Sequence, residues 1–130
     1  MNLRITQSDG VPIYLQIINQ IKQLITAGRL VLDQELLPIR VLAEELTVNP
    51  NTVARAYREL EAEGWVYKKR GAGTFVSDQH SALSAEFCDK QIRERVKSLL
   101  TEAKHMNIST QEIIQIINEE SKEFAKEPSS

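Results

Sequence analysis

The side chains that could do chemistry in this 130-residue chain gather just after Thr47, where amides, hydroxyls and guanidinium groups share one face of a predicted helix. These polar residues are Asn49, Asn51, Thr52, Arg55 and Arg58. Short hydrogen-bonding groups and arginines at the start of a helix suit the base edges and phosphates of a DNA groove. A solvated helix face would carry the same residue types, so the neighbouring elements must decide between the two interpretations.

The segment 50–63 has the sequence features of a helix. Asn49 can cap its start with a side-chain oxygen, and Pro50 suits the first helical turn, where no backbone donor is needed. Gly64 suits the position just after the last turn. The apolar face is formed at helical spacing by Val53, Tyr57 and Leu60. We therefore predict a helix that packs one side on a core and leaves the polar side of its first turns exposed.

Two more helices are predicted upstream. The first spans about 12–28, with an apolar stripe of Tyr14, Ile17, Ile18, Ile21, Leu24 and Ile25 and a wet side of Gln16, Asn19, Gln20, Lys22 and Gln23. The second is short, about 38–46, and Pro38 can occupy its first turn. Residues 47–49 then form a tight turn into the helix that begins at Pro50. Two helices joined by so short a turn, the second exposed at its start, form a helix-turn-helix.

The period of the pattern changes from helical to alternating after Gly64. Segments 65–69 and 74–77 are β-prone, and a glycine-rich loop, 70–73, separates them. The loop contributes three candidate contacts, Arg70, Gly71 and Gly73, and it follows Lys69. Glycines let a backbone approach a phosphate closely, although turn geometry alone would also require them. The predicted fold class of residues 1–77 is a winged helix-turn-helix, mainly α with a small β-hairpin.

The remaining residues are predicted to form a linker, 78–85, and a two-helix tail, 86–126. Ser109 and Glu112 match a capping box, which marks the start of the last helix. The candidate dimerisation residues are Ile92, Val96, Leu99, Leu100, Ile113, Ile114 and Ile117. These apolar residues cover more surface than one partner helix can bury. They therefore either pack on the N-terminal unit or form a dimer interface, and the second interpretation is favoured.

Composition limits the remaining function classes. The net charge is −2, but Lys and Arg number nine against eight Asp and Glu through Ser77, and seven against ten after it. The first part also carries three consecutive cations, Lys68, Lys69 and Arg70. One cysteine, Cys88, and two histidines are a poor supply for a metal site, and no catalytic constellation is evident, so we expect no metal, no cofactor and no enzyme activity. No apolar run reaches membrane-span length, which predicts a cytoplasmic protein.

The segments now described resemble the GntR family of bacterial transcription regulators. The resemblance covers about residues 11–77 and rests on 12–17, 28–30, 36–40, 42–43, 48–64 and 70–76. The short tail resembles that of the YtrA-type subfamily. The family usually has Pro-Gly-Asp where this chain has Leu32-Asp33-Gln34, and a serine where it has Pro38, which removes a candidate phosphate contact. Arg40 keeps its place.

The resemblance implies a repressor that binds a palindromic double-stranded DNA operator as a homodimer, with the helix at 50–63 in the major groove. The implied contacts are Arg40, Asn49, Asn51, Thr52, Arg55, Arg58, Lys69, Arg70, Gly71 and Gly73. Two such units should reach half-sites about one helical turn, roughly 34–36 Å, apart or a multiple of it. A small-molecule effector is a further implied partner, without an indication of its identity. Arg58 sits further along the helix, and a pair with Glu61 at the helix surface is the alternative to a DNA contact for this residue. The alternative function for the whole chain is a winged-helix module that binds protein and not DNA.

Overall fold

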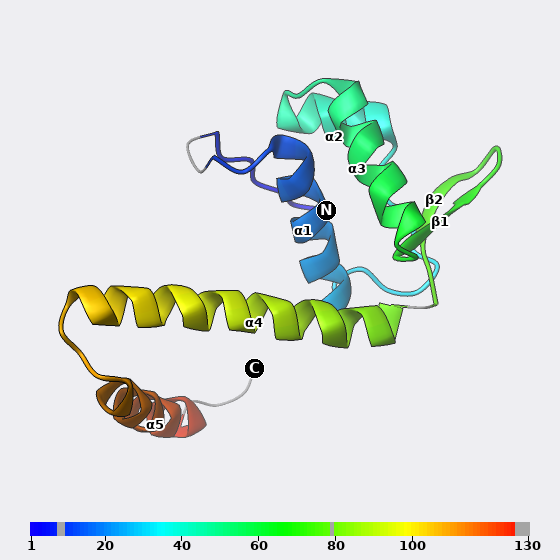
Figure 1. Cartoon of the computed structure of the whole chain (residues 1–130). Helices are drawn as coiled ribbons and strands as arrows, with labels where there is room; N and C mark the ends of the chain where they lie inside the picture. The colour runs from blue at the N-terminus through cyan, green and yellow to red at the C-terminus, as the bar shows by residue number, and fades with distance from the viewer. Residues whose placement is uncertain (8–9, 79, 127–130) are drawn as a thin grey trace. The chain divides into compact units, whose positions relative to one another are not determined.

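A computed structural model describes residues 1–7, 10–78 and 80–126, which divide into two compact units, 1–88 and 89–130. The elements are α1 (Ile13–Thr26), α2 (Ile39–Leu46), α3 (Pro50–Ala62), β1 (Val66–Lys69), β2 (Gly73–Val76), α4 (His80–His105) and α5 (Thr110–Lys126). The order of helix, helix, helix and hairpin confirms the predicted winged helix-turn-helix, followed by a helical C-terminal region (Figure 1). The division between the units falls within α4, after Cys88.

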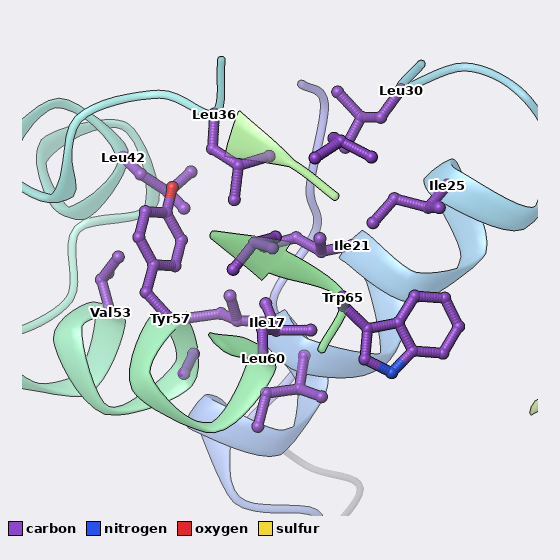
Figure 2. Close-up of a cluster of buried hydrophobic side chains, with 14 of the residues drawn as sticks. Ile17, Ile21, Ile25, Leu30, Leu36, Leu42, Val53, Tyr57, Leu60 and Trp65 are labelled. Carbon is purple, nitrogen blue, oxygen red and sulfur yellow. The ribbon is translucent and has the colours of Figure 1, made fainter. Parts of the chain in front are cut away.

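The core of the first unit lies where α1, α2 and α3 meet. Ile17, Ile21, Leu42, Val53 and Leu60 are each 0% exposed. Figure 2 shows these side chains converging with Leu36 of the connection before α2 and with Trp65, which follows α3. The apolar stripes of the three helices bury one another, so the polar sides of the helices face solvent.

The helix ends explain how α2 and α3 are joined. Pro38 stands one position earlier than predicted, at the N-cap of α2 with a non-helical ψ of 146°, and makes no side-chain cap. Thr47 ends α2 in the left-handed region, with φ 56°, and its N–H and that of Val48 return to the carbonyls of Glu44 and Ala43. A β-branched residue rarely adopts this conformation, so the turn is held by its surroundings.

The hairpin of β1 and β2 is an antiparallel pair (Figure 1). In its register Val66 faces Val76 and Lys69 faces Gly73. The connection 33–36 runs along the other edge of β2, which the sequence pattern did not indicate. The N–H of Leu36 donates to Thr74 at 2.8 Å, and that of Asp33 donates to Val76 at 2.9 Å. The β2 edge of the hairpin is therefore held by the connection that precedes α2.

An N-terminal arm lies against α1. Gln16 accepts from the N–H of Thr6 at 2.8 Å and donates to its carbonyl at 2.6 Å, while Gln20 makes the equivalent pair of bonds with Arg4. The prediction that Gln16 lies on the wet side of the helix is wrong, because it is only 9% exposed. A side-chain amide can pair with both backbone groups of an extended residue, so a buried glutamine fits here.

The prediction that 78–85 forms an irregular linker is also wrong, because α4 begins at His80. Leu83 packs against the core of the first unit, and Phe87, four residues on, is 9% exposed and meets the Trp65 ring edge-on at 5.8 Å between centroids. Apolar residues at i and i+4 share one helix face. Their burial favours helix in a segment whose small polar composition suggested a loop.

Tyr57 ties α3 to the start of α2, since its hydroxyl donates to the carbonyl of Leu37 at 2.7 Å. Burial raises the pKa of the Tyr57 phenol above its ordinary value of 10.0. A phenol with a raised folded-state pKa stabilises the fold fully below about pH 10 and loses that contribution as the pH rises further. Tyr57→Phe should cost about 1 kcal/mol at pH 7 through the lost hydrogen bond.

The same variant should lose less stability than the wild-type protein between pH 9 and pH 11, which urea unfolding at a series of pH values can measure. Tyr67→Phe is the comparison. Tyr67 is 37% exposed and its pKa is raised mainly by its hydrogen bond to Asp33, so removing this phenol should reduce the alkaline loss of stability less than Tyr57→Phe does. An alkaline loss of stability in Tyr57→Phe as steep as that of the wild-type protein would contradict the assignment.

The second unit contains the rest of α4, and α5. Ser109 caps α5 by accepting from the N–H of Glu112 at 3.2 Å, as the capping box predicted. The buried apolar residues of its described part are Ala103 and Ile113, at 5% and 8% exposure. No helix in the described part of the chain is long and apolar enough to cross a membrane.

Candidate nucleic-acid interface

The predicted polar face lies at the exposed start of α3. Asn49 caps the helix, its side-chain oxygen accepting from the N–H of Asn51 at 2.8 Å. Asn51 is exposed and Thr52 half-buried, in the first turn. Arg40 is exposed in the first turn of α2. Asn49 is therefore foremost a residue that fixes where α3 begins, because its oxygen is already engaged.

Arg55 is held from two sides. Its guanidinium carbon lies 3.7 Å from the centroid of the Tyr14 ring of α1, and its Nε lies 3.4 Å from Oε1 of Glu59, one turn along α3. The side chain is nevertheless 53% exposed. A guanidinium that lies on an aromatic face and beside a carboxylate keeps a fixed plane.

Arg58 lies further along α3 and lines a groove of about 140 Å³ with Lys68 of β1. The groove is completed by Ile39, Ala54, Tyr57, Glu61 and Thr74. The alternative pairing of Arg58 with Glu61 is not found among the ion pairs of the described residues. The structure thus brings a cation of α3 and a cation of β1 to one groove between α3 and the strands.

The wing tip is a tight turn after Lys69. The N–H of Ala72 returns to the carbonyl of Lys69 at 2.9 Å, and Lys68, Lys69 and Arg70 are exposed. Gly71 has φ 78° with open space around it. Gly73 has φ 133°, and a Cβ there would lie 2.9 Å from Oε1 of Glu35. Both glycines are thus required by the positive φ of the turn, whereas the Glu35 carboxylate near Gly73 ends a flexible exposed side chain that can move aside.

The sequence pattern did not identify several residues that contact the side chains of the candidate interface. Tyr14 counted only as one member of an apolar stripe, and Glu59 carried no assignment. Asp33 has φ 64° at the position where the family usually has glycine, and it accepts from the hydroxyl of Tyr67 at 2.7 Å. The glycine that the family usually has at this position is a sequence signal for the positive φ of Asp33. The contacts of Tyr14 and Asp33 join residues far apart in the sequence and have no such local signal.

The candidate dimerisation residues divide into two groups. Six of them are exposed, between 38% and 62%, namely Ile92, Val96, Leu99, Leu100, Ile114 and Ile117. Ile113 differs, because it is 8% exposed and already covered within the chain. It therefore has little surface left for a partner. Met106, Ile116 and Phe124 are further exposed apolar residues that the prediction omitted.

The fold and its exposed polar helix define a winged helix-turn-helix protein, and comparison with known proteins identifies the family. The family model described as "Bacterial regulatory proteins, gntR family" matches residues 13–76. The HTH-type transcriptional repressor YtrA of Bacillus subtilis (strain 168) is 34% identical over 117 residues, which cover 90% of each chain. The chain belongs to the GntR family of bacterial regulatory proteins, and its short-tailed, YtrA-like character is confirmed.

Solved structures agree with this placement. A transcriptional regulator from Oenococcus oeni superposes with a TM-score of 0.71 at 28% identity, covering 92% of this chain and 97% of that one. The DNA-binding domain of AraR in complex with operator ORX1 has a TM-score of 0.54 at 25% identity, covering 59% of this chain and all of that one. The chain is thus a transcription regulator with a DNA-binding domain, and its family consists of regulators and not enzymes.

Proposed function

We propose that this protein is a repressor that binds a palindromic operator as a homodimer, with α3 in the major groove and the wing on the adjacent backbone. The observation that carries the proposal is the start of α3. Asn49 fixes it, and the helix presents Asn51 and Arg55 to solvent while its apolar face is fully buried. The names of similar proteins, a transcriptional repressor and a domain bound to an operator, support the same function.

The candidate contacts fall into two classes. Asn51, Thr52 and Arg55 lie in the first two turns of α3, the part of a recognition helix that reaches base edges. Arg40, Arg58, Lys69 and Arg70, with the backbone of Gly71 and Gly73, supply phosphate contacts. Phosphate contacts fix the register of the protein on DNA, and base contacts select the sequence. We add Lys68 to the residues that contact phosphates, because it lines the same groove as Arg58.

The homodimer is proposed on the apolar surface of the second unit. Nine large apolar residues between Ile92 and Phe124 are 38% or more exposed, against two buried apolar residues in that unit's described part. So many exposed large apolar residues against so few buried ones are typical of a surface that a partner covers. On α4, Ile92, Val96, Leu99 and Leu100 follow the spacing of a single stripe. A second copy of the same stripe, related by a two-fold axis, would cover it.

Dimerisation and DNA reading depend on each other in this proposal. One helix and one wing contact too few base pairs to select a site alone, and two copies on a symmetric site add their contacts. Bound dimers would repress by occluding a promoter. The proposed location is the cytoplasm, where bacterial DNA lies.

The test begins with selection of binding sites by the full-length wild-type protein from random-sequence duplexes. We expect an enriched palindrome. Arg55→Ala combined with Arg70→Ala should then lower affinity for that duplex by at least about a hundredfold at moderate salt, since it removes a base contact and a phosphate contact. The slope of log affinity against log salt should become shallower by about 1 through the lost phosphate contact.

The matched control is Lys90→Ala combined with Lys97→Ala, which removes the same charge from exposed positions of α4 away from the stripe. It should leave both affinity and slope close to those of the wild-type protein. An equal loss in both double variants would show that only net charge matters. Selection that enriches no sequence would favour the alternative, a winged-helix module that binds protein.

A further inference from the structure

Tyr14 differs from the other residues of the α1 stripe in what its ring touches. Ile17 and Ile21 are completely buried in the core, whereas Tyr14 is half-buried and its ring lies under the guanidinium of Arg55, 3.7 Å from centroid to Cζ. At that distance the two groups are in face contact, and the ring therefore sets the plane of the guanidinium. The contact joins the first turn of α1 to the second turn of α3.

Glu59 sets the remaining orientation within that plane. Its carboxylate lies 3.4 Å from the Nε of Arg55, so the Nε edge is directed towards the helix. The two terminal amino groups form the opposite side of the planar fork and are the donors left for a ligand. Since the side chain is 53% exposed, that pair of donors is accessible.

We propose that Tyr14 is a positioning residue that, with Glu59, presents the two terminal amino groups of Arg55 to the O6 and N7 atoms of a guanine. This inference rests on the proposed function, and it assigns the base that Arg55 reads and the residue that aims it. A guanidinium fork matches the two adjacent acceptors of guanine in the major groove.

A phosphate is the less suitable target for this arrangement. The carboxylate of Glu59 lies beside Arg55 and repels a phosphate, while a neutral base does not experience that repulsion. A phosphate contact also needs charge more than orientation, and a freely rotating Lys or Arg supplies it. Holding the plane of Arg55 with a ring on α1 therefore serves sequence selection more than general attraction to DNA.

The experiment compares Tyr14→Leu with Tyr14→Phe in the full-length protein. The probes are the duplex enriched by selection with the wild-type protein and an unselected duplex of equal length. Tyr14→Leu should weaken binding to the enriched duplex by up to about tenfold, because a guanidinium no longer held by the ring must be ordered on binding. Binding to the unselected duplex should change less than about twofold. Tyr14→Phe keeps the aromatic face and should restore the wild-type affinity.

Two further measurements separate positioning from simple packing. In an Arg55→Ala background, Tyr14→Leu should cause no additional loss. Replacing the guanine by 7-deazaguanine, which lacks N7, should weaken the wild-type protein at one guanine of each half-site and should leave Arg55→Ala unaffected. Tyr14→Leu should show a reduced penalty at that same guanine.

Each opposite result overturns the proposal. Equal weakening on both duplexes, or an undiminished effect of Tyr14→Leu in the Arg55→Ala background, would reduce Tyr14 to a structural residue. If no 7-deazaguanine substitution weakened binding of the wild-type protein, the proposal that Arg55 contacts a guanine would be wrong. Failure of the proposed function would appear earlier and differently, as a wild-type protein that enriches no duplex.

Discussion

Val96→Glu combined with Leu100→Glu is expected to produce a monomer that binds the operator at least about a thousandfold more weakly than the wild-type protein. Both side chains lie on the exposed stripe of α4, at 44% and 38% exposure, so the protomer itself loses little packing. In a two-fold dimer each substitution appears twice. Four apolar side chains are then lost from the interface, and like charges face one another across it.

The magnitude follows from these numbers of side chains. Fully burying one aliphatic side chain contributes about 1.5–3 kcal/mol. Because Val96 and Leu100 are already partly buried in the protomer, a dimer buries only the remainder of each, and we take about 1 kcal/mol per side chain. Four of them together correspond to about three powers of ten in the dimer dissociation constant. The cost of bringing carboxylates together adds to that loss.

Sedimentation equilibrium at micromolar concentration measures the effect directly, and binding to the enriched duplex measures its consequence. The control is Ser98→Glu combined with Thr101→Glu, which introduces the same charge at exposed positions away from the stripe of α4. That variant should remain a dimer. A dimeric Val96→Glu/Leu100→Glu protein would place the interface elsewhere, and a monomeric wild-type protein would contradict the dimer altogether.

Leu60→Ala should reduce the free energy of unfolding by about 3–4 kcal/mol. Leu60 is 0% exposed at the junction of α1, α3 and the start of the hairpin (Figure 2). Truncating a buried leucine removes its transfer free energy and leaves a cavity that close-packed neighbours fill only in part. The loss is a large share of the 5–15 kcal/mol that typically separates folded from unfolded domains.

Urea unfolding followed through the fluorescence of Trp65, the single tryptophan, reports this value, because Trp65 is 2% exposed in the same core. Protein concentration must be kept constant, since dimerisation stabilises the folded state. Leu32→Ala is the matched control. Leu32 is 47% exposed, so the same truncation should cost less than about 0.5 kcal/mol. A loss below 1 kcal/mol in Leu60→Ala would mean that the core relaxes around the change.

Local sequence signals were sufficient for most of the helices and for the hairpin. The apolar stripe of α1, the Asn49 cap and the glycine turn each depend on neighbouring residues. Such periodic and capping patterns are visible without knowledge of the fold. The placement of α3 at 50–63 was accordingly correct to one residue at its C-terminus.

Contacts between distant segments were beyond such reasoning. Burial of Gln16 depends on an arm that comes before the helix, and the helical start of α4 depends on Leu83 and Phe87 meeting a core built earlier in the chain. Ile113 had the same sequence signature as Ile117, yet the first is covered and the second is half exposed. Periodicity identifies a set of apolar residues, but it cannot divide them between an internal contact and a partner.

The arm held by Gln16 and Gln20 matches the residue spacing of an extended chain to that of a helix. The glutamines are four residues apart on a helix, and the residues they hold, Thr6 and Arg4, are two apart on an extended chain. Four helical residues rise about 6.0 Å, and two extended residues rise about 6.6 Å, so the two spacings nearly coincide. The extended segment thus finds this spacing of partners only when α1 is helical, so formation of the arm is coupled to formation of the helix.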